Sequence, residues 1–135
     1  MLRLAQERDR LDIVDDQIGA PTGAELLADI TAQIIHTTGV NNYDNKSGIY
    51  HLTADGHTSW YSFADLILTH AKKFAKPLKV QPDAVYAIKT SNFPTPAKRP
   101  RNSRLNTYKL QKTFDLTLPN WQTCAVRTLN EILSK

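Results

Sequence analysis

Apolar side chains recur every three or four positions in three segments of the chain, which is the spacing of one helix face. The pattern predicts three amphipathic helices, each with one face turned toward a core. The positions are Leu27, Ile30, Ile34 and Ile35 in the first segment, Trp60, Phe63, Ala64, Ile67, Ala71 and Phe74 in the second, and Trp121, Ala125, Leu129 and Ile132 in the third.

Residues that start and end helices stand beside the first two segments. Thr22 and Glu25 have the spacing of a capping box, so we expect the first helix to begin there. It is expected to end near Gly39, a residue type that favours helix C-termini. Thr58 or Ser59 is expected to cap the second helix.

Prolines mark the end of the second helix and the start of the third. Pro77 closes the second helix, and Pro119 favours the first turn of the third because its fixed φ suits that position. Two shorter helices are expected over residues 1–8 and 106–112, the latter capped by Asn106.

Residues of high β-propensity predict short strands between the helices. Residues 11–15 alternate apolar with polar side chains, and residues 48–53 are nearly continuously apolar, as in a strand covered on both faces. Another strand is expected near residues 78–80, and residues 41–47 are expected to form a polar loop. Strands that alternate with capped helices are typical of α/β proteins, so we expect a helix-rich α/β fold with few short strands.

The composition is that of one globular domain over residues 1–135. Hydrophobic residues make up 41% of the chain, and no apolar run approaches the roughly 20 residues of a membrane helix. The N-terminal residues lack the apolar stretch of a signal peptide, so we expect a cytoplasmic protein with no membrane partner. The single cysteine, Cys124, excludes an intrachain disulfide and is expected to be a small core residue.

The positive charge is concentrated in one segment. Residues 84–114 hold seven Lys and Arg residues and no Asp or Glu, whereas the rest of the chain is slightly acidic. Such a segment suits a nucleic acid or a phosphorylated small molecule, and a solvated face is the plain alternative. We expect no nucleic-acid partner, because no aromatic stacking pattern accompanies the cations.

The motifs of catalysis and cofactor binding are absent or weak. None of the five glycines is spaced as in a dinucleotide-binding turn or a P-loop, so this chain alone is not expected to bind NADPH or NADH. Tyr108 and Lys112 match the Tyr-x-x-x-Lys pattern of short-chain dehydrogenases, but a solvated helix face is the favoured interpretation. The four histidines show no metal-binding spacing.

Two segments remain as candidates for ligand binding. Residues 15–23 join the end of a predicted strand to the start of a predicted helix, where ligands bind in open α/β sheets. A plain connector is the alternative for them. Asp15 and Asp16 should point to opposite faces, so at most one belongs to a site. Residues 86–105 combine stiffening prolines with arginines, whose forked N–H groups suit phosphate oxygens.

These segments resemble the dTDP-4-dehydrorhamnose reductases, which are extended short-chain dehydrogenases. The matching stretches are residues 16–29 (DQIGAPTGAELLAD), 48–52 (GIYHL), 93–107 (FPTPAKRPRNSRLNT) and 118–122 (LPNWQ). Phe93 and Lys98 stand where the family usually has Tyr and Arg. The resemblance covers essentially the whole chain, in order and with similar spacing.

The resemblance implies that this chain is the C-terminal, substrate-binding part of a reductase with a Rossmann-type fold. The family's glycine-rich loop and its catalytic residues would lie in a missing N-terminal half, a partner of this chain. Tyr108 and Lys112 lie where the family has no catalytic pair. The implied reaction is the NADPH- or NADH-dependent reduction of dTDP-4-dehydro-β-L-rhamnose to dTDP-β-L-rhamnose, used for cell-surface polysaccharide. This chain alone is expected to be inactive.

Four residues are expected to bind the dTDP-sugar in the complete enzyme. Arg99 and Arg104 would hold the diphosphate, while Gln17 and Thr22 would line the sugar end. The alternative is that the two arginines pair with carboxylates of the N-terminal half. The resemblance is compatible with Mg²⁺, for which no ligand can be placed, and with a homodimer. A non-catalytic binding or regulatory module of the same fold is the alternative function.

Overall fold

The computed structural model of the chain describes residues 1–39 and 46–134. It is a helix-rich α/β structure with few short strands, as the sequence predicts. Its elements are α1 (Leu2–Glu7), β1 (Leu11–Val14), β2 (Ile18–Gly19), α2 (Ala24–Thr38), β3 (Thr58–Ser59), α3 (Trp60–Lys73), η1 (Pro82–Ala84), β4 (Val85–Ile88), η2 (Thr90–Asn92), α4 (Tyr108–Phe114) and α5 (Trp121–Leu133).

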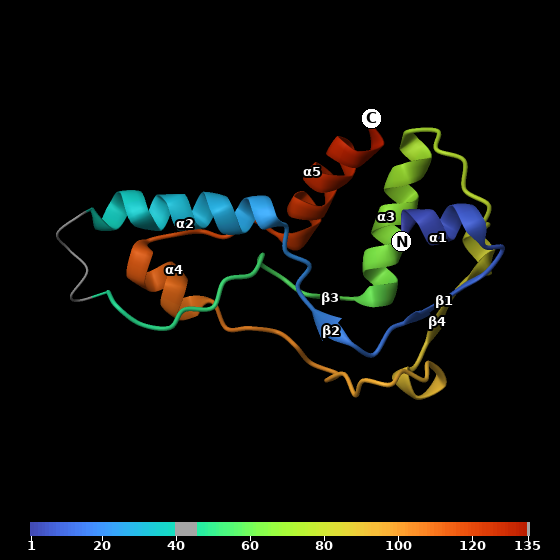
Figure 1. Cartoon of the computed structure of the whole chain (residues 1–135), viewed down its shortest axis with the longest axis horizontal. Coiled ribbons are helices and arrows are strands. Elements are labelled where there is room, and N and C mark those ends of the chain that lie inside the picture. The colour runs from blue at the N-terminus through green and yellow to red at the C-terminus, as the bar shows by residue number, and fades with distance from the viewer. Residues whose placement is uncertain (40–45, 135) are drawn as a thin grey trace.

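Two small sheets organise these elements. β1 and β4 pair in parallel, with Val14 opposite Ile88, while β2 and β3 pair antiparallel. Parallel strands leave a sheet at the same edge, so the segments that follow β1 and β4 start side by side (Figure 1). In the described part of the chain, no helix combines the length and apolarity needed to cross a membrane.

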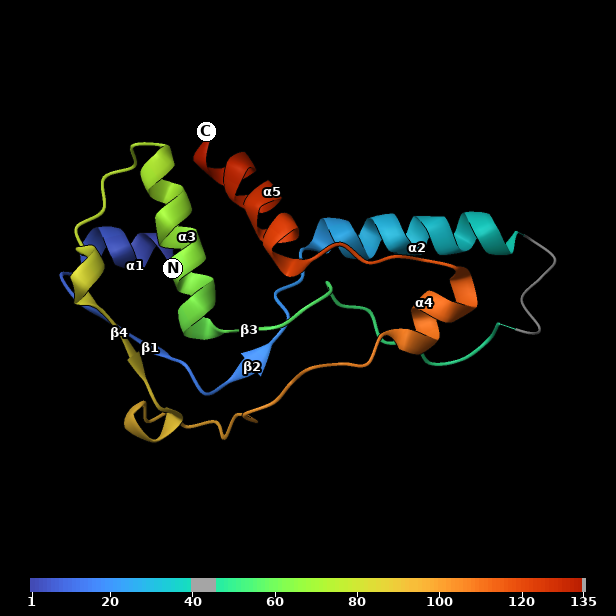
Figure 2. The same cartoon turned by 180° about the vertical axis from the view of Figure 1, so that it is seen from behind.

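Three clusters of buried side chains hold the helices together. The first joins α2, α4 and the start of α5, the second joins α1, β1 and α3, and the third joins α3 to α5. Figures 1 and 2 show the result: α2 lies over α4 at one end, and α3 stands between α5 and α1. The buried members of the first cluster are Leu26, Ile30, Ala54, Leu110, Phe114, Leu118 and Trp121.

The start of α3 confirms the predicted cap and ties the helix to β1. Ser59 Oγ accepts a hydrogen bond from Ser62 N (3.1 Å) and donates one to Asp15 Oδ1 (2.7 Å). Asn120 caps α5 in a similar way, because its Oδ1 accepts from Gln122 N (3.0 Å).

Replacing Ser59 by alanine is expected to lower the free energy of unfolding by about 1–2 kcal/mol. The change removes the cap of α3 and leaves Asp15 without its hydroxyl donor. Urea unfolding followed by far-UV circular dichroism measures the loss. Ser47→Ala, at an exposed position, is the matched control and should change stability by less than about 0.5 kcal/mol. Equal stability of the two variants would refute the capping role.

The capping box predicted for the first helix is wrong. α2 begins at Ala24 with Gly23 as its N-cap, and no side chain caps it. Thr22 Oγ1 instead donates to Ala20 O (3.0 Å) and accepts from Ala54 N (3.1 Å). The Thr22 hydroxyl is therefore used by a backbone partner far away in sequence, which local spacing does not reveal.

The strand predicted over residues 48–53 is also wrong. This stretch is irregular, although Tyr50 and Leu52 pack against the first cluster. Residues of high β-propensity form a strand only where a neighbouring strand can take up the backbone hydrogen bonds, and no strand of residues 1–39 and 46–134 does so here. Of the predicted polar loop 41–47, residues 41–45 lie outside the described residues.

The strand near residues 78–80 is wrong as well, and the actual strand, β4, lies a few residues later. Lys79 N and Val80 N both donate to Ala5 O instead (2.9 and 3.1 Å). The backbone of this segment is thereby bonded to α1, and the chain reaches the edge of β1 only at Val85.

The short helices over residues 1–8 and 106–112 are confirmed as α1 and α4. α4 extends to Phe114, and its N-cap is Thr107 rather than Asn106. Asn106 Oδ1 nevertheless accepts from the first helical amide, at Tyr108 N (2.9 Å).

In α2 and in α5, a residue predicted to be buried is exposed, and an apolar residue next to it in the sequence is buried instead. In α2, Leu26 is buried while Leu27 and Ile35 are exposed. In α5, Leu133 is buried while Ile132 is 53% exposed. Helical spacing identifies an apolar stripe, but the position of the neighbouring helices decides which of two adjacent apolar residues enters the core.

Candidate functional site

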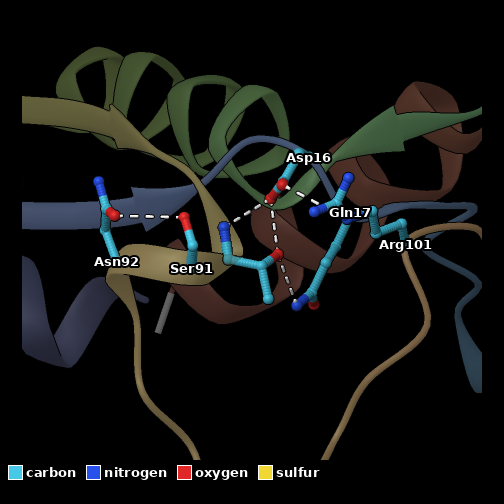
Figure 3. Close-up of polar contacts among 6 residues, drawn as sticks. Asp16, Gln17, Ser91, Asn92 and Arg101 are labelled. Atoms are coloured by element: carbon cyan, nitrogen blue, oxygen red, sulfur yellow. Dashed lines mark hydrogen bonds and ion pairs between the residues drawn. The ribbon is translucent and has the colours of Figure 1, made fainter.

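The segments that follow β1 and β4 are joined by hydrogen bonds to one carboxylate. Thr90 lies at the start of η2, and its backbone N and its Oγ1 both donate to Asp16 Oδ1 (2.8 and 2.6 Å). Gln17 Nε2 donates to Thr90 Oγ1 (3.2 Å). Figure 3 shows Asp16 and Gln17 next to Arg101, whose Nε lies 3.9 Å from Asp16 Oδ2.

Asp15 and Asp16 contact different parts of the fold, as expected for adjacent side chains that point to opposite faces. Asp15 accepts a hydrogen bond from the Ser59 hydroxyl at the start of α3, and Asp16 accepts one from the Thr90 hydroxyl after β4. The hydrogen bond from the Thr90 hydroxyl, assisted by its backbone N–H and by Arg101, holds the pKa of Asp16 below its usual range against the opposing effect of burial.

Acid is expected to destabilise the chain through Asp16. The unfolded-state pKa is near 3.9 and the folded-state pKa is lower, so the ionised carboxylate stabilises the fold fully above about pH 4. This contribution is lost as the pH falls through the folded-state pKa. Urea unfolding between about pH 2 and pH 6 should therefore show a weaker pH dependence in Asp16→Asn than in the wild type.

Asp65→Asn is the control for that titration. Asp65 is an exposed residue of α3 with no hydrogen bond or ion pair in the described part of the chain. Its variant should keep the wild-type pH dependence. If Asp16→Asn also keeps it, Asp16 does not contribute to acid unfolding.

A pocket of about 750 Å³ lies along the connector between β1 and α2. The connector, the start of α3, the inner face of α5, residues 1–3 and the segment after η2 form its walls. Most of the lining is apolar, with few polar groups, which is the usual composition of a small-molecule site. Its lining includes Gln17, Thr22, Ser59, Trp60, Phe63, Arg99, Ser103, Cys124, Ala125, Leu129 and Ile132.

One side of the pocket belongs to a strap, residues 91–106, in which every residue is exposed. Backbone hydrogen bonds hold it to β2: Ile18 N donates to Arg101 O (2.8 Å), and Ser103 N donates to Ile18 O (2.9 Å). Figures 1 and 2 show this part of the chain running from η2 to α4. The strap therefore brings Arg99, Pro100 and Ser103 to the edge of the pocket.

The cations of this segment differ in their partners. Arg101 faces Asp16, while Lys109 Nζ donates to Ile49 O (3.1 Å) and lies over the Tyr50 ring. No carboxylate of the described residues forms an ion pair with Arg99. Arg99 is thus a pocket-lining residue whose positive charge is not neutralised by a carboxylate of the described residues.

The four residues expected to bind the sugar nucleotide are not all brought together. Gln17, Thr22 and Arg99 line the same pocket, whereas Arg104 lies outside its lining. Arg104 Nε instead donates to Asn102 Oδ1 (3.0 Å), farther along the strap. The Thr22 hydroxyl is already engaged in the hydrogen bonds described above.

Sequence reasoning missed Thr90 and the apolar side of the pocket. Thr90 lies in a stretch with no recognisable motif, and its contact with Asp16 spans 74 positions. The apolar side did leave a signal in the sequence, because Trp60 belongs to the predicted apolar stripe of the second helix. The structure adds that Trp60 is 48% exposed. Exposed apolar side chains that line a hollow are typical of binding sites.

Two glycines of the connector between β1 and α2 lie close to protein side chains. A Cβ added at Gly19 would lie 2.8 Å from Ser103 Oγ, and one at Gly23 would lie 2.7 Å from Glu25 Oε2. Protein side chains fill this space, and the Glu25 carboxylate would repel a pyrophosphate at the start of α2. The described residues also contain no group of three side chains able to hold a metal ion.

Three other side chains considered from the sequence, Tyr108, Lys112 and Cys124, show no arrangement for catalysis among the described residues. Tyr108 is 64% exposed on α4, and Lys112 Nζ lies 5.7 Å from its ring centroid, as expected for a solvated helix face. Cys124 is half-buried against the first cluster and lines the pocket. Burial raises the pKa of the Cys124 thiol, so it is protonated at neutral pH and a poor nucleophile.

The fold is of the α/β class, and its candidate ligand site is the pocket where β1 leads into α2. The chain belongs to the family described as the RmlD substrate binding domain, whose model matches residues 1–134.

Similar proteins are named as dTDP-4-dehydrorhamnose reductases. The chain is 49% identical to the one from Escherichia coli and 48% identical to the one from Salmonella typhimurium, each over 134 residues. These matches cover 99% of this chain and 44% of either relative. The chain therefore spans less than half the length of these relatives.

A solved structure has the same fold. It is the dTDP-4-dehydrorhamnose reductase from Bacillus anthracis in complex with NADP, which matches with a TM-score of 0.77 at 31% identity. The match covers 96% of this chain and 41% of that one. The predicted resemblance and the α/β fold class are thus confirmed.

Proposed function

We propose that this chain is the sugar-nucleotide-binding part of a dTDP-4-dehydrorhamnose reductase. The observation that carries the proposal is the pocket, which places Gln17, Thr22 and Arg99 together where β1 leads into α2. The family assignment supports dTDP-4-dehydro-β-L-rhamnose as the ligand. In this role Arg99, with Arg104 farther along the strap, holds the diphosphate, and Gln17 and Thr22 lie at the sugar end.

The reaction of the complete enzyme is the reduction of the C4 ketone to dTDP-β-L-rhamnose. A nicotinamide cofactor supplies a hydride to C4, and a proton reaches the oxygen from an acid outside this chain, which leaves NAD(P)⁺ and the alcohol. The residues of this chain bind and orient the sugar nucleotide. The strap suits this task because Pro96 and Pro100 restrict the backbone and lower the entropic cost of ordering it around a ligand.

The proposal also concerns assembly. The pocket face of α3 and α5 would meet the nicotinamide-binding part of the enzyme, so that the sugar lies between the two parts. A cytoplasmic location and a homodimer of the complete enzyme remain predictions.

Isothermal titration of the 135-residue chain with dTDP-β-L-rhamnose tests the proposal. We expect binding of dTDP-β-L-rhamnose and of dTDP, no binding of NADPH, and no turnover of dTDP-4-dehydro-β-L-rhamnose with NADPH. Fusion behind the remaining N-terminal part of the Escherichia coli relative should restore turnover. Absence of dTDP-β-L-rhamnose binding in both proteins would refute the proposal, and turnover by the isolated chain would refute its inactivity.

A further inference from the structure

At the polar end of the pocket, Gln17, Thr90 and Asp16 form a chain of hydrogen bonds, here called the relay. Each of its hydrogen bonds has a defined donor and acceptor. The Thr90 hydroxyl carries a single proton, and Asp16 Oδ1 lies 2.6 Å from it. An ionised carboxylate can only accept, so the Thr90 proton points to Asp16. Thr90 Oγ1 is then left with lone pairs alone for its other neighbour, the amide of Gln17, 3.2 Å away.

The direction of the relay fixes the orientation of the Gln17 amide. The amide nitrogen must face Thr90, because the flipped amide would place two acceptors against each other without a proton between them. Figure 3 shows this nitrogen turned toward the relay. Gln17 Oε1 accepts no hydrogen bond from any described residue, and Gln17 lines the pocket. The lowered pKa of Asp16 agrees with a carboxylate that only accepts.

We propose that Asp16 and Thr90 are positioning residues that make Gln17 Oε1 a fixed hydrogen-bond acceptor for a sugar hydroxyl of the bound dTDP-sugar. This inference rests on the proposed function and deepens it. A sugar hydroxyl can donate to Oε1, whereas the C4 keto oxygen of the substrate has no proton to donate. The relay thus disfavours the keto group at Gln17 and leaves it free for the catalytic groups of the complete enzyme.

Thr90→Val removes the relay and keeps much of the local structure. Valine has nearly the shape of threonine, and the backbone N–H of residue 90 can still donate to Asp16. The orientation of the amide is tested without any ligand by the hydrogen exchange of the Gln17 side-chain NH₂ in ¹⁵N-labelled 135-residue chain. We expect faster exchange in Thr90→Val and wild-type exchange in Thr90→Ser. Unchanged exchange in Thr90→Val would refute the relay.

Selection of a sugar hydroxyl is tested by titrating the same variants with dTDP-β-L-rhamnose and with dTDP. Thr90→Val should bind dTDP-β-L-rhamnose about tenfold more weakly and bind dTDP as the wild type does, and Thr90→Ser should restore the loss. Because Thr90 acts through Gln17, adding Thr90→Val to Gln17→Ala should cause no further loss.

The other outcomes separate the relay from the proposed function. Equal losses for both ligands, or a further loss in the double variant, would show that Thr90 supports only the local structure and would refute the inference. Wild-type affinity of Thr90→Val for dTDP-β-L-rhamnose would also refute it, with the proposed function intact. If neither ligand binds the wild type, the proposed function and hydroxyl selection both fail, and the exchange experiment decides the amide orientation alone.

Discussion

Replacing Trp121 by alanine should lower the free energy of unfolding by about 3–5 kcal/mol. Trp121 is the first residue of α5 and is only 6% exposed. Its ring packs in the first cluster and meets Phe63 edge-on, with the centroids 6.1 Å apart. Its removal leaves a cavity between α3, α5 and the Gly56 turn, where a Cβ at Gly56 would already lie 3.1 Å from the indole.

Urea unfolding followed by far-UV circular dichroism measures this loss, with Trp60→Ala as the matched control. Trp60 is the same residue type at the start of the neighbouring helix and is 48% exposed, so its variant should lose only about 1 kcal/mol. Comparable losses in the two variants would show that the first cluster does not depend on Trp121.

Replacing Arg99 by alanine should weaken binding of dTDP-β-L-rhamnose by about 1.5–3 kcal/mol, roughly ten- to hundredfold in Kd. Arg99 lines the pocket, and no carboxylate of the described residues neutralises it. Its guanidinium can engage two diphosphate oxygens at once, so alanine removes a charge-assisted contact. Isothermal titration of the 135-residue chain gives the change in Kd.

Lys98→Ala is the matched control for Arg99. It removes the same charge from the neighbouring position of the strap, outside the pocket lining. Its effect should be small and should fade with added salt, because only long-range attraction is lost. Arg104→Ala is expected to have an intermediate effect. Normal binding by Arg99→Ala would support the alternative that the arginines pair with carboxylates of the other part of the enzyme.

The helices that the sequence predicts well are those with strong local signals at their ends. The start of α3 is identifiable because Ser59 precedes an apolar stripe, and its hydroxyl caps the helix within four residues. The capping box at Thr22 has the same kind of signal and is wrong, because the Ala54 amide, 32 residues away, takes up the hydroxyl. A local motif predicts structure only when no distant partner competes for its polar atoms.

The strands show the same limit. Residues 48–53 have the composition of a strand but pair with no strand of the described residues, whereas β4 is a strand because it meets β1, more than 70 residues earlier in the chain. The candidate site depends on this pairing. The parallel register brings Asp16 and Gln17 to Thr90, although nothing in the sequence around Thr90 indicates a role.

By itself, the sequence determined the α/β class, the positions of the long helices, the basic segment and the family, because periodicity, helix ends, charge and motifs are local properties of the chain. The tertiary structure alone decided which of two adjacent apolar residues is buried in α2 and in α5, that Arg99 rather than Arg104 lines the pocket, and that Gln17 forms a hydrogen bond with Thr90. These features depend on the parallel pairing of β1 with β4 and on the packing of α3 against α5, which join residues distant in sequence.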